Sequence, residues 1–476
     1  MPRSIFCCSA FALAAVASLA AAPHAAGQGQ GLNGAMAKPE GSQPAGPALS
    51  QACGDLETRL SALEAKLADQ QREPGGLEWH DTSGQQFTQR WTGRIMGDGV
   101  LIAGQDSASL AAFGNQSNYF EFRSVRIAVD GQGYGVFDYK LELELEPEFG
   151  GAQAVRMRDL HVGIAEIPWF GYVRLGNFKE PFSLEQMYSR KFITFLERSL
   201  ADVFVPRRHV GMCAYQHTAD ERFTWAFGAF IQDVDQDLKE RVDDNQGIDL
   251  PVRVTWNPIY TAGGRGVLHL GLGYVWTDDR DDLLRFAVAP ETHEMDAFID
   301  TGILTVSDYH RLGGELAVVY GPFSVQSELI YVAANGIAGL ADQDFCAAYL
   351  FGSWFLTGEH RVYKRASGAF ARVKPNTNFW LVRTVDQDID WGWGAWELAI
   401  RWSYLDLTTN GIPRPQRNGK NGLANNLTLG LNWYWNPHMR LMFNYIHSWA
   451  SVVDTIGLAD GVADTDILSM RMQVDF

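Results

Sequence analysis

Apolar and polar residues alternate one by one over most of the chain from residue 88 to its end. The stretch 137–146, FDYKLELELE, carries Phe, Tyr and Leu at its odd positions and Asp, Lys and Glu at its even positions. The same alternation runs through 396–404 and 427–445. A period of two is typical of β-strands with one apolar and one polar face. The pattern therefore predicts an all-β domain over residues 88–476, with about sixteen strands, a number in the range that closes into a barrel.

Residues 427–445 indicate how neighbouring strands are joined. Two alternating runs flank a short turn at 436–438, which is the arrangement of an antiparallel hairpin. Each run is about ten residues long, the length with which a tilted strand crosses a bilayer. Short turns alternate with long polar connections. A further short turn is 321–322, and the long polar connections include 233–248, 277–307 and 407–424.

Alternation alone fits two kinds of protein. In a soluble β-sandwich the apolar faces pack into a shared core, whereas in a transmembrane barrel they face lipid and the polar faces surround a water-filled lumen. Three features favour the barrel: the unequal connections, the aromatic residues at strand ends that would form membrane-interface girdles, and the form of the last strand. The aromatic residues are Trp433, Trp435, Tyr445 and Trp449.

The last strand, 467–476, reads ILSMRMQVDF and alternates up to its final residue. Chain ends usually fray and rarely carry so regular a pattern. A terminal aromatic residue on an alternating strand is typical of outer-membrane barrels, whose assembly machinery recognises it. We therefore expect a transmembrane antiparallel β-barrel in contact with outer-membrane lipid, with Phe476 as the residue that the barrel assembly machinery binds.

Residues 1–27 have the composition of a secretory signal peptide. Arg3 precedes an apolar, alanine-rich run, and small residues follow at 25–27. A membrane anchor is the alternative, which the short apolar run and the missing stop-transfer flank disfavour. Residues 28–48 are rich in Gly, Ala and Pro, and we expect them to form a disordered leader.

The pattern changes again over residues 49–73. Apolar residues recur there at alternating spacings of four and three, as in a coiled coil, and REPGG at 72–76 ends the pattern. A lone amphipathic helix resting on the barrel is the alternative, but the narrow apolar stripe favours an oligomerising coiled coil, which we expect in the periplasm. The apolar positions are Leu49, Cys53, Leu56, Leu60, Leu63 and Leu67.

Charge and cysteine content exclude several other classes of protein. The formal net charge of −17 argues against a nucleic-acid partner, because such binding rests on clustered Lys and Arg. The three cysteines outside the signal peptide, Cys53, Cys213 and Cys346, are far apart and predict neither a disulfide framework nor a metal site. We expect no cofactor.

Catalysis and calcium binding are also disfavoured. His161 and Asp159 share one predicted strand face, but no G-x-S-x-G motif supplies a nucleophile, so we expect them to line water. The acidic stretches 233–237 and 278–282 are interpreted as solvated loop charge. The first of them lacks the glycine that an EF-hand needs at its sixth position, which is Leu238 here.

Six stretches together resemble the phosphate-selective porin (porin O and P) family, and the resemblance covers most of 90–476. It implies a sixteen-stranded outer-membrane barrel, usually trimeric, that conducts anions such as phosphate or polyphosphate by passive diffusion through a narrowed lumen. Some members carry a periplasmic coil. The stretches are GRIMGD (93–98), FRSVRI (122–127), VRLGNFKEPFSLEQ (173–186), FITFLERSL (192–200), WGAWELAIRWSYLDL (393–407) and LTLGLNWYWNPHMRLMFNYIHS (427–448).

The resemblance also implies that a long loop folds into the barrel and presents basic side chains to the permeating anion. Region 177–211 is too long and irregular for a strand and fits that loop. Guanidinium and ammonium groups suit an anion filter because they replace lost hydration with charge-assisted hydrogen bonds. The constriction candidates are Lys179, Arg190, Lys191, Arg198, Arg207 and Arg208, and strand parity places Arg94, Arg126, Arg174, Arg401 and Arg471 on the lumen side.

An alternative function remains open. The same basic residues could serve as structural ion pairs with carboxylates such as Glu180, Glu185 and Glu197, in a general, weakly selective or cation-tolerant pore. Two positions depart from the family: Arg123-Ser124 stands where two adjacent arginines are common, and Gln186 stands near a basic position. The overall acidic charge, and the lumen parity of Glu142, Glu144 and Glu146, also weigh against anion preference.

Overall fold

The computed structural model describes part of the second of two compact units, Trp79–Phe476. The predicted signal peptide, leader and coiled coil, which occupy 1–73, lie outside the described residues. The described residues are 87–146, 154–232, 247–278, 282–337, 339–383, 389–409, 421–452 and 462–476.

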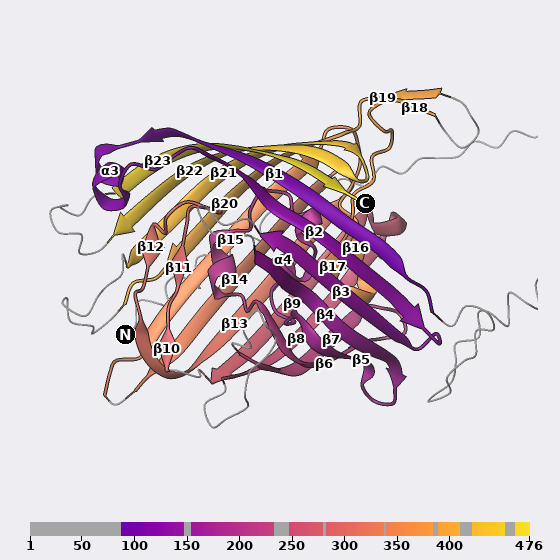
Figure 1. Cartoon of the computed structure of the whole chain (residues 1–476), viewed down its shortest axis with the longest axis horizontal. Coiled ribbons are helices and arrows are strands. Elements are labelled where there is room, and N and C mark those ends of the chain that lie inside the picture. The colour runs from indigo at the N-terminus through magenta and orange to yellow at the C-terminus, as the bar shows by residue number, and fades with distance from the viewer. Residues whose placement is uncertain are drawn as a thin grey trace, which may run out of the picture. The chain divides into compact units, whose positions relative to one another are not determined.

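Sixteen antiparallel strands form a closed barrel (Figure 1), which confirms the predicted fold. Each strand pairs with the next barrel strand along the chain, and the last, β23, pairs with the first, β1. The strands are β1 (Arg90–Gln105), β2 (Tyr119–Gly133), β3 (Phe137–Glu146), β4 (Ala154–Ile167), β5 (Gly171–Lys179), β6 (Arg208–His217), β7 (Phe223–Ile231), β8 (Ile248–Thr261), β9 (Gly266–Asp278), β13 (Leu304–Tyr320), β14 (Phe323–Gly336), β15 (Gln343–Phe355), β20 (Ala395–Asp406), β21 (Gly422–Asn436), β22 (Met439–Val452) and β23 (Val462–Asp475).

Short elements occupy the connections between these strands. None of the helices among the described residues is long and apolar enough to cross a membrane. The helices are α3 (Ser107–Phe113), α4 (Leu184–Met187), η1 (Arg190–Phe192), η2 (Leu200–Phe204), η3 (Ala262–Gly264) and η4 (Arg365–Ser367). The short strands are β10 (Leu283–Leu284), β11 (Ala287–Val288), β12 (Ile299–Asp300), β16 (Tyr363–Lys364), β17 (Ala369–Phe370), β18 (Trp380–Arg383) and β19 (Ile389–Gly392).

The barrel has two unlike ends. One end, which we call the turn end, holds the start of β1, the end of β23 and most of the short turns between strands. The other, the loop end, holds the long connections, including 106–118 and 180–207. The connection 356–394, between β15 and β20, is long although it lies at the turn end, and the sequence pattern did not predict it. The turns at the turn end are 134–136, 168–170, 218–222, 262–265, 321–322 and 437–438.

Strand β23 shows how alternation builds the barrel wall. Leu468, Met470 and Met472 are 41–46% exposed on the outside, whereas Arg471 between them is fully buried on the inside. Because successive side chains of a strand point to opposite faces, one apolar and one polar set are separated by the sheet itself. The outer surface is accordingly apolar, as a lipid-facing surface must be.

The chain's final residue closes the barrel. The backbone N–H of Gly93 on β1 donates to the carbonyl oxygen of Phe476 at 2.8 Å, and the N–H of Phe476 donates to the carbonyl of Gly93 at 3.1 Å. The Phe476 ring lies so close over Gly93 that a Cβ atom at this position would collide with the ring. A larger residue at position 93 would therefore have to displace this ring, and it would also lie close to the Arg126 carbonyl oxygen.

Substituting Gly93→Ala is expected to weaken barrel closure. The added methyl group has to displace the Phe476 ring, and overpacking of this kind costs about 1–3 kcal/mol. We expect the heat-modifiable band of the folded barrel on gels to disappear at a lower temperature. Gly99→Ala is the matched control, because the position lies on the same strand and a Cβ there meets nothing within 4 Å. Equal melting of the two variants would contradict this role of Gly93.

Candidate channel site in the barrel lumen

Segment 180–207 leaves the wall after β5 and folds into the lumen, where α4 lies (Figure 1). Glu328 on β14 accepts hydrogen bonds from the backbone N–H groups of Leu184 (2.9 Å) and Glu185 (2.8 Å). These are N–H groups at a helix start, which a carboxylate stabilises. Phe182 packs on the wall at Gly273, where a Cβ would come within 2.8 Å of the ring. The wall thus holds this segment through the hydrogen bonds of the Glu328 carboxylate and through the close packing of the Phe182 ring on Gly273.

Segment 282–303 also folds inward, from the loop end. Its Glu291 accepts hydrogen bonds from Arg401 (2.5 Å) and Ser403 on β20 and from Thr428 on β21. Phe298 stacks on Phe113 of α3 with ring centroids 3.9 Å apart. The interpretation of 277–307 as a polar connection was therefore incomplete, because its apolar residues belong to the barrel interior.

A third segment, 356–375, enters the lumen from the turn end. Tyr363 hydrogen-bonds His269 on β9 at 2.6 Å. Arg253 on β8 donates to the carbonyl oxygen of Gly368 at 2.9 Å. Arg361 lies over the Phe370 ring, 3.7 Å from its centroid. The lumen is thus narrowed from both ends of the barrel.

These segments fill one half of the lumen with an apolar core. Inward-facing positions on β13–β15 and β20–β23 carry Ile330, Val332, Phe345, Phe351 and Ile446, all buried against residues of the inward segments. The prediction that inward faces line water is therefore wrong for this half of the barrel. Apolar side chains of the wall pack there against apolar side chains of the inward segments, because this contact removes both surfaces from water.

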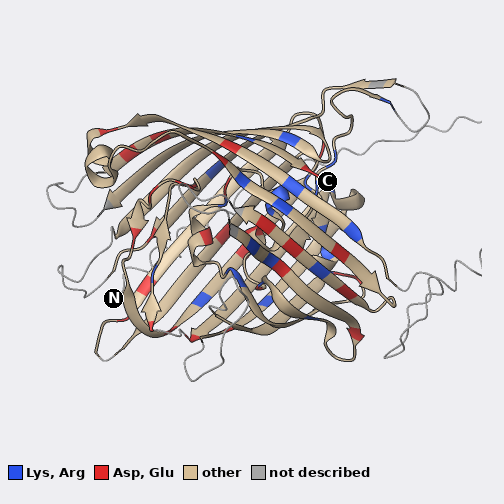
Figure 2. Cartoon of the chain, in the orientation of Figure 1, with Lys and Arg blue, Asp and Glu red and all other residues tan. Residues whose placement is uncertain are grey.

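Partly exposed charged side chains remain on the other half, on the inward faces of β1–β6 and on segment 180–207. The side chain of Lys140 is 25% exposed and that of Arg158 is 28% exposed. Arg401 and Arg471, by contrast, are almost completely buried. Figure 2 shows the blue and red positions gathered on β2, β3 and β4.

The first cluster of charges joins β1 to β6. Arg126 donates to Glu144 at 2.6 Å and also contacts Glu142, and Lys140 donates to Glu142 at 2.7 Å. Arg208 pairs with Asp159 at 2.6 Å. Among the described residues, four cations therefore share three carboxylates, directly or through Ser124, and Arg158 joins them through Glu144 while making further contacts. The cluster, which we call the strand network, consists of Arg94, Ser124, Arg126, Lys140, Glu142, Glu144, Arg158, Asp159 and Arg208.

The second cluster surrounds Glu197 of segment 180–207. Arg123 (2.7 Å) and Arg471 (2.8 Å) contact this carboxylate, and Arg190 approaches it at 3.7 Å. Arg471 also pairs with Asp98 at 2.6 Å. Burial opposes ionisation of Glu197, yet the two arginines Arg123 and Arg471 hold the pKa of this carboxyl well below its ordinary value. Three cations thus share two carboxylates in this Glu197 network.

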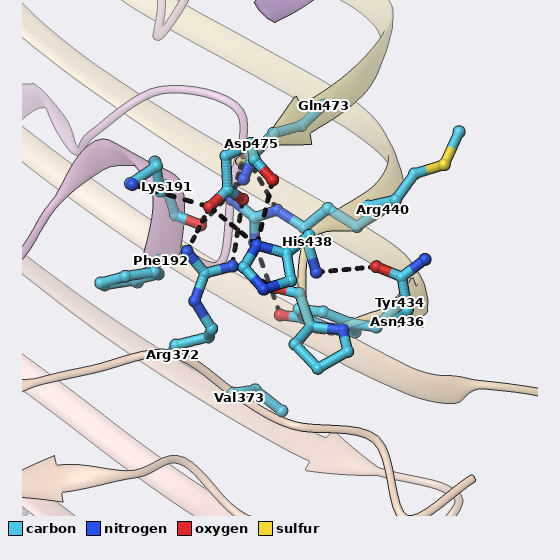
Figure 3. A pocket seen from close by; sticks show the side chains of 12 residues that line it. Lys191, Phe192, Arg372, Val373, Tyr434, Asn436, His438, Arg440, Gln473 and Asp475 are labelled. Carbon is cyan, nitrogen blue, oxygen red and sulfur yellow. Dashed lines mark hydrogen bonds and ion pairs between the residues drawn. The ribbon is translucent and has the colours of Figure 1, made fainter. Parts of the chain in front are cut away.

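The third cluster lies in a pocket at the turn end (Figure 3). Lys191 and Arg372 both contact Asp475, Lys191 at 3.6 Å. Arg440 borders the same pocket and donates to Gln473 at 3.0 Å. Segment 180–207 contributes Lys191, segment 356–375 contributes Arg372, and β23 contributes Asp475. Two cations share one carboxylate in this Asp475 network.

Other predicted site residues hold the inward loop together. The Lys179 ammonium donates to the backbone carbonyls of Gln186 (2.6 Å) and Tyr188 (3.2 Å). Arg198 is buried and donates to the carbonyl of Glu185 at 3.0 Å. Arg207 pairs with Asp202 at 2.6 Å and is 61% exposed.

The remaining lumen-parity residues are also bound to neighbours. Arg174 donates to the Tyr172 hydroxyl at 3.1 Å and lies over the Phe178 ring. Arg94 donates to Ser124 at 2.9 Å. Sequence reasoning missed Arg123, Lys140, Arg158 and Arg372. Strand parity could have found Lys140, which shares the parity of Glu142. Arg123 and Arg158 lie at register shifts of β2 and β4, where the alternation changes phase, and Arg372 follows no regular pattern.

Two groups of His and carboxylate side chains come close enough to resemble metal ligands. His209 lies 2.5 Å from Glu180 and 3.4 Å from Asp249. His293 contacts Glu121 at 2.7 Å and is also within 2.9 Å of Glu294. Both groups tie an inward segment to the wall: the first holds the start of 180–207 and the second holds 282–303 to β2.

Comparisons with known proteins agree with this architecture. The sequence profile of the family described as "Phosphate-selective porin O and P" matches residues 106–476. Porin O of Pseudomonas aeruginosa is 25% identical over 439 residues, covering 84% of this chain and 91% of that protein. An uncharacterized protein of Caulobacter vibrioides is 27% identical over 471 residues, covering 94% of this chain and 86% of that protein.

Solved porin structures are more distant. An anion-selective porin from Comamonas acidovorans is 14% identical, with a TM-score of 0.48, covering 82% of this chain and 100% of that chain. OmpT of Vibrio cholerae in its trimer form is 12% identical, with a TM-score of 0.47, covering 82% of this chain and 99% of that chain.

Proposed function

The chain belongs to the phosphate-selective porin O and P family of outer-membrane channel proteins, and on this premise we propose that it lets small anions diffuse passively through the charged half of its lumen. Phosphate is the solute that the family description names, and polyphosphate is proposed beside it as an anion of the same chemistry. The inward segments narrow the lumen, so a solute would pass close to the strand, Glu197 and Asp475 networks. No energy input or chemical step is needed for such passage.

One observation carries this proposal: cations outnumber carboxylates in each of the three networks. Among the described residues, and without Arg158, which makes further contacts, four cations share three carboxylates in the strand network. Three cations share two carboxylates around Glu197, and two share one at Asp475. A guanidinium whose carboxylate is already shared keeps donors available for a passing oxyanion. The local excess supports anion preference even though the whole chain is acidic, because nearby charges act more strongly than distant, screened ones.

A second candidate is a weakly selective or cation-tolerant diffusion pore. It is favoured by the close pairing of Arg126, Arg208 and Arg471, each of which contacts a carboxylate within 2.8 Å. If such pairs neutralise one another, they shape the lumen without attracting anions. The two candidates differ in the sign of the ion preference.

Reversal potentials in a salt gradient decide between the two candidates. The purified protein is inserted into planar bilayers with unequal KCl concentrations on the two sides. We expect a reversal potential of the sign that indicates preference for chloride, and a chloride current that falls when phosphate is added, because phosphate competes for the same donors. A potential near zero or of the opposite sign would reject anion preference and favour the second candidate.

Assembly is a further part of the proposal. The family resemblance implies a trimer, and the predicted coiled coil at 49–73 would join three chains in the periplasm. Phe476 is proposed as the residue that the barrel assembly machinery binds, since its side chain is 61% exposed on the outer surface of the barrel.

A further inference from the structure

An apolar hairpin extends from the turn end of the barrel. It consists of β18 and β19, which pair antiparallel within the long connection 356–394 and lie beyond the barrel wall (Figure 1). Most of its described side chains are large, apolar and more than half exposed. They are Trp380 (60%), Leu381 (57%), Ile389 (58%), Trp391 (53%) and, directly after β19, Trp393 (61%).

The base of the hairpin packs on the outer face of the wall. Trp433 of β21 occupies an outward position, because its neighbours Asn432 and Tyr434 are buried on the inside. Its indole N–H donates to the carbonyl oxygen of Trp393 at 2.8 Å. Phe379, just before β18, lies 4.6 Å from the Trp433 ring and 5.4 Å from the Trp435 ring. The hairpin therefore starts outside the lumen, on the side that faces lipid.

These contacts join the hairpin to a group of aromatic side chains on the outer wall, Trp396, Trp433 and Trp435, which we call the aromatic belt. Trp396 of β20 stacks on Trp433 with ring centroids 4.9 Å apart. On the side of the belt nearer the loop end, Leu398, Ile400 and Leu429 are 41–50% exposed on the lipid-facing surface. Trp side chains gather where the apolar bilayer core meets the headgroups, because an indole ring is apolar and its N–H is polar. The belt marks that level on this barrel.

We propose that the β18–β19 hairpin is a membrane-interface anchor, which lies on the barrel's outer side among the phospholipid headgroups of the periplasmic leaflet. Short turns mark the periplasmic end of outer-membrane barrels. At that level the exposed Trp, Leu and Ile side chains leave water and continue the apolar surface of the wall. An apolar patch of this size left in the periplasm would be costly, since contiguous exposed patches normally mark contact surfaces. The anchor does not depend on which ions the channel prefers.

The test places a fluorophore on the hairpin. Leu381→Cys is labelled with a polarity-sensitive dye in protein reconstituted into zwitterionic phospholipid vesicles. Cys213 and Cys346 are buried and Cys53 is replaced by alanine, so the new thiol is the reactive one. Some vesicles carry lipids with a spin label near the headgroup, and others carry the spin label at the end of the acyl chain. Two controls are labelled in the same way: Leu398→Cys on the lipid-facing wall and Ala219→Cys in a turn at the same end.

The dye at Leu381→Cys should lose roughly half of its fluorescence with the shallow spin label and less with the deep one, as expected of a residue at the interface. Leu398→Cys should respond more to the deep label, and Ala219→Cys to neither. Quenching of the Leu381→Cys dye by aqueous iodide, as for Ala219→Cys, would place the hairpin in water and overturn the proposal. Protection from both lipid and iodide would indicate contact with another chain and would also overturn it.

The result can be checked on the other strand of the hairpin. Trp391→Cys should give the same depth of quenching as Leu381→Cys, because the two residues are paired across β18 and β19. The heat-modifiable band on gels shows for each variant that the barrel is folded. Different depths at the two positions would contradict a hairpin that lies flat at the interface.

Discussion

Substituting Arg401→Ala is expected to raise single-channel conductance several-fold. Arg401 holds two inward segments at once: its guanidinium donates to Glu291 of 282–303 at 2.5 Å and to the carbonyl of Glu197 in 180–207 at 3.0 Å. It also lies over the Phe195 ring, 4.3 Å from the centroid. Without it, the buried Glu291 carboxylate loses its cation, and a buried charge left in this way costs about 3–5 kcal/mol. Both segments should then leave the wall and widen the route.

Controls separate loop release from general damage to the barrel. Arg285→Ala removes an arginine from the same inward segment, but Arg285 is exposed and its pair with Asp300 is worth only about 0–1 kcal/mol. Its conductance should match the parent protein. Glu291→Gln, which removes only the negative charge, should open the channel partly and with more current noise. A folded Arg401→Ala barrel with unchanged conductance would show that the segments are held by apolar packing alone.

The largest change in ion preference is expected from the double substitution Lys191→Met and Arg372→Met. It keeps an unbranched, flexible side chain at both positions but leaves Asp475 without its two cations in the pocket of Figure 3. A unit charge about 4 Å from an ion contributes about 1 kcal/mol even in water-like surroundings, and more where the dielectric constant is lower. We therefore expect the chloride-over-potassium permeability ratio to fall by roughly tenfold. Reversal potentials measure this ratio directly.

A matched control removes the same charge elsewhere at the turn end. Lys364→Met with Arg265→Met changes two exposed cations that do not line the pocket. If the control lowers the ratio as much as Lys191→Met with Arg372→Met, selectivity is set by the overall field and not by the Asp475 network. An unchanged ratio in both double variants would assign Lys191 and Arg372 to structural pairing, which is the alternative function described above.

The barrel wall could be predicted from sequence because neighbouring residues alone decide which side chains of a strand face lipid and which face the lumen. Each strand separates two solvents by alternation, so the position of Arg471 between Met470 and Met472 is enough to place it inside. The closing strand and its terminal Phe476 were recognisable for the same reason. Turns such as 321–322 also follow from local residues.

The contents of the lumen could not be predicted in this way. Arg401 and Glu291 are far apart in sequence, and nothing near either residue indicates that they meet. The docking of Phe182 on Gly273 likewise depends on a fit between distant residues. The apolar residues of 282–303, such as Phe286 and Phe298, were the available signal that this connection is not purely polar. Irregular segments obey no fixed period, so their packing emerges only once the wall exists.

Closure of the wall by β23, the last strand, has a consequence for biogenesis. Residues 94–105 of β1 cannot pair along this edge until residues 465–475 of β23 have been synthesised, exported and delivered. This edge of β1 therefore stays unpaired longer than any other strand edge of the barrel. Free edges invite pairing with other chains, and contacts between distant residues form slowly. A nascent chain that lacks β23 would keep that edge open, so the wall closes only after this strand has arrived.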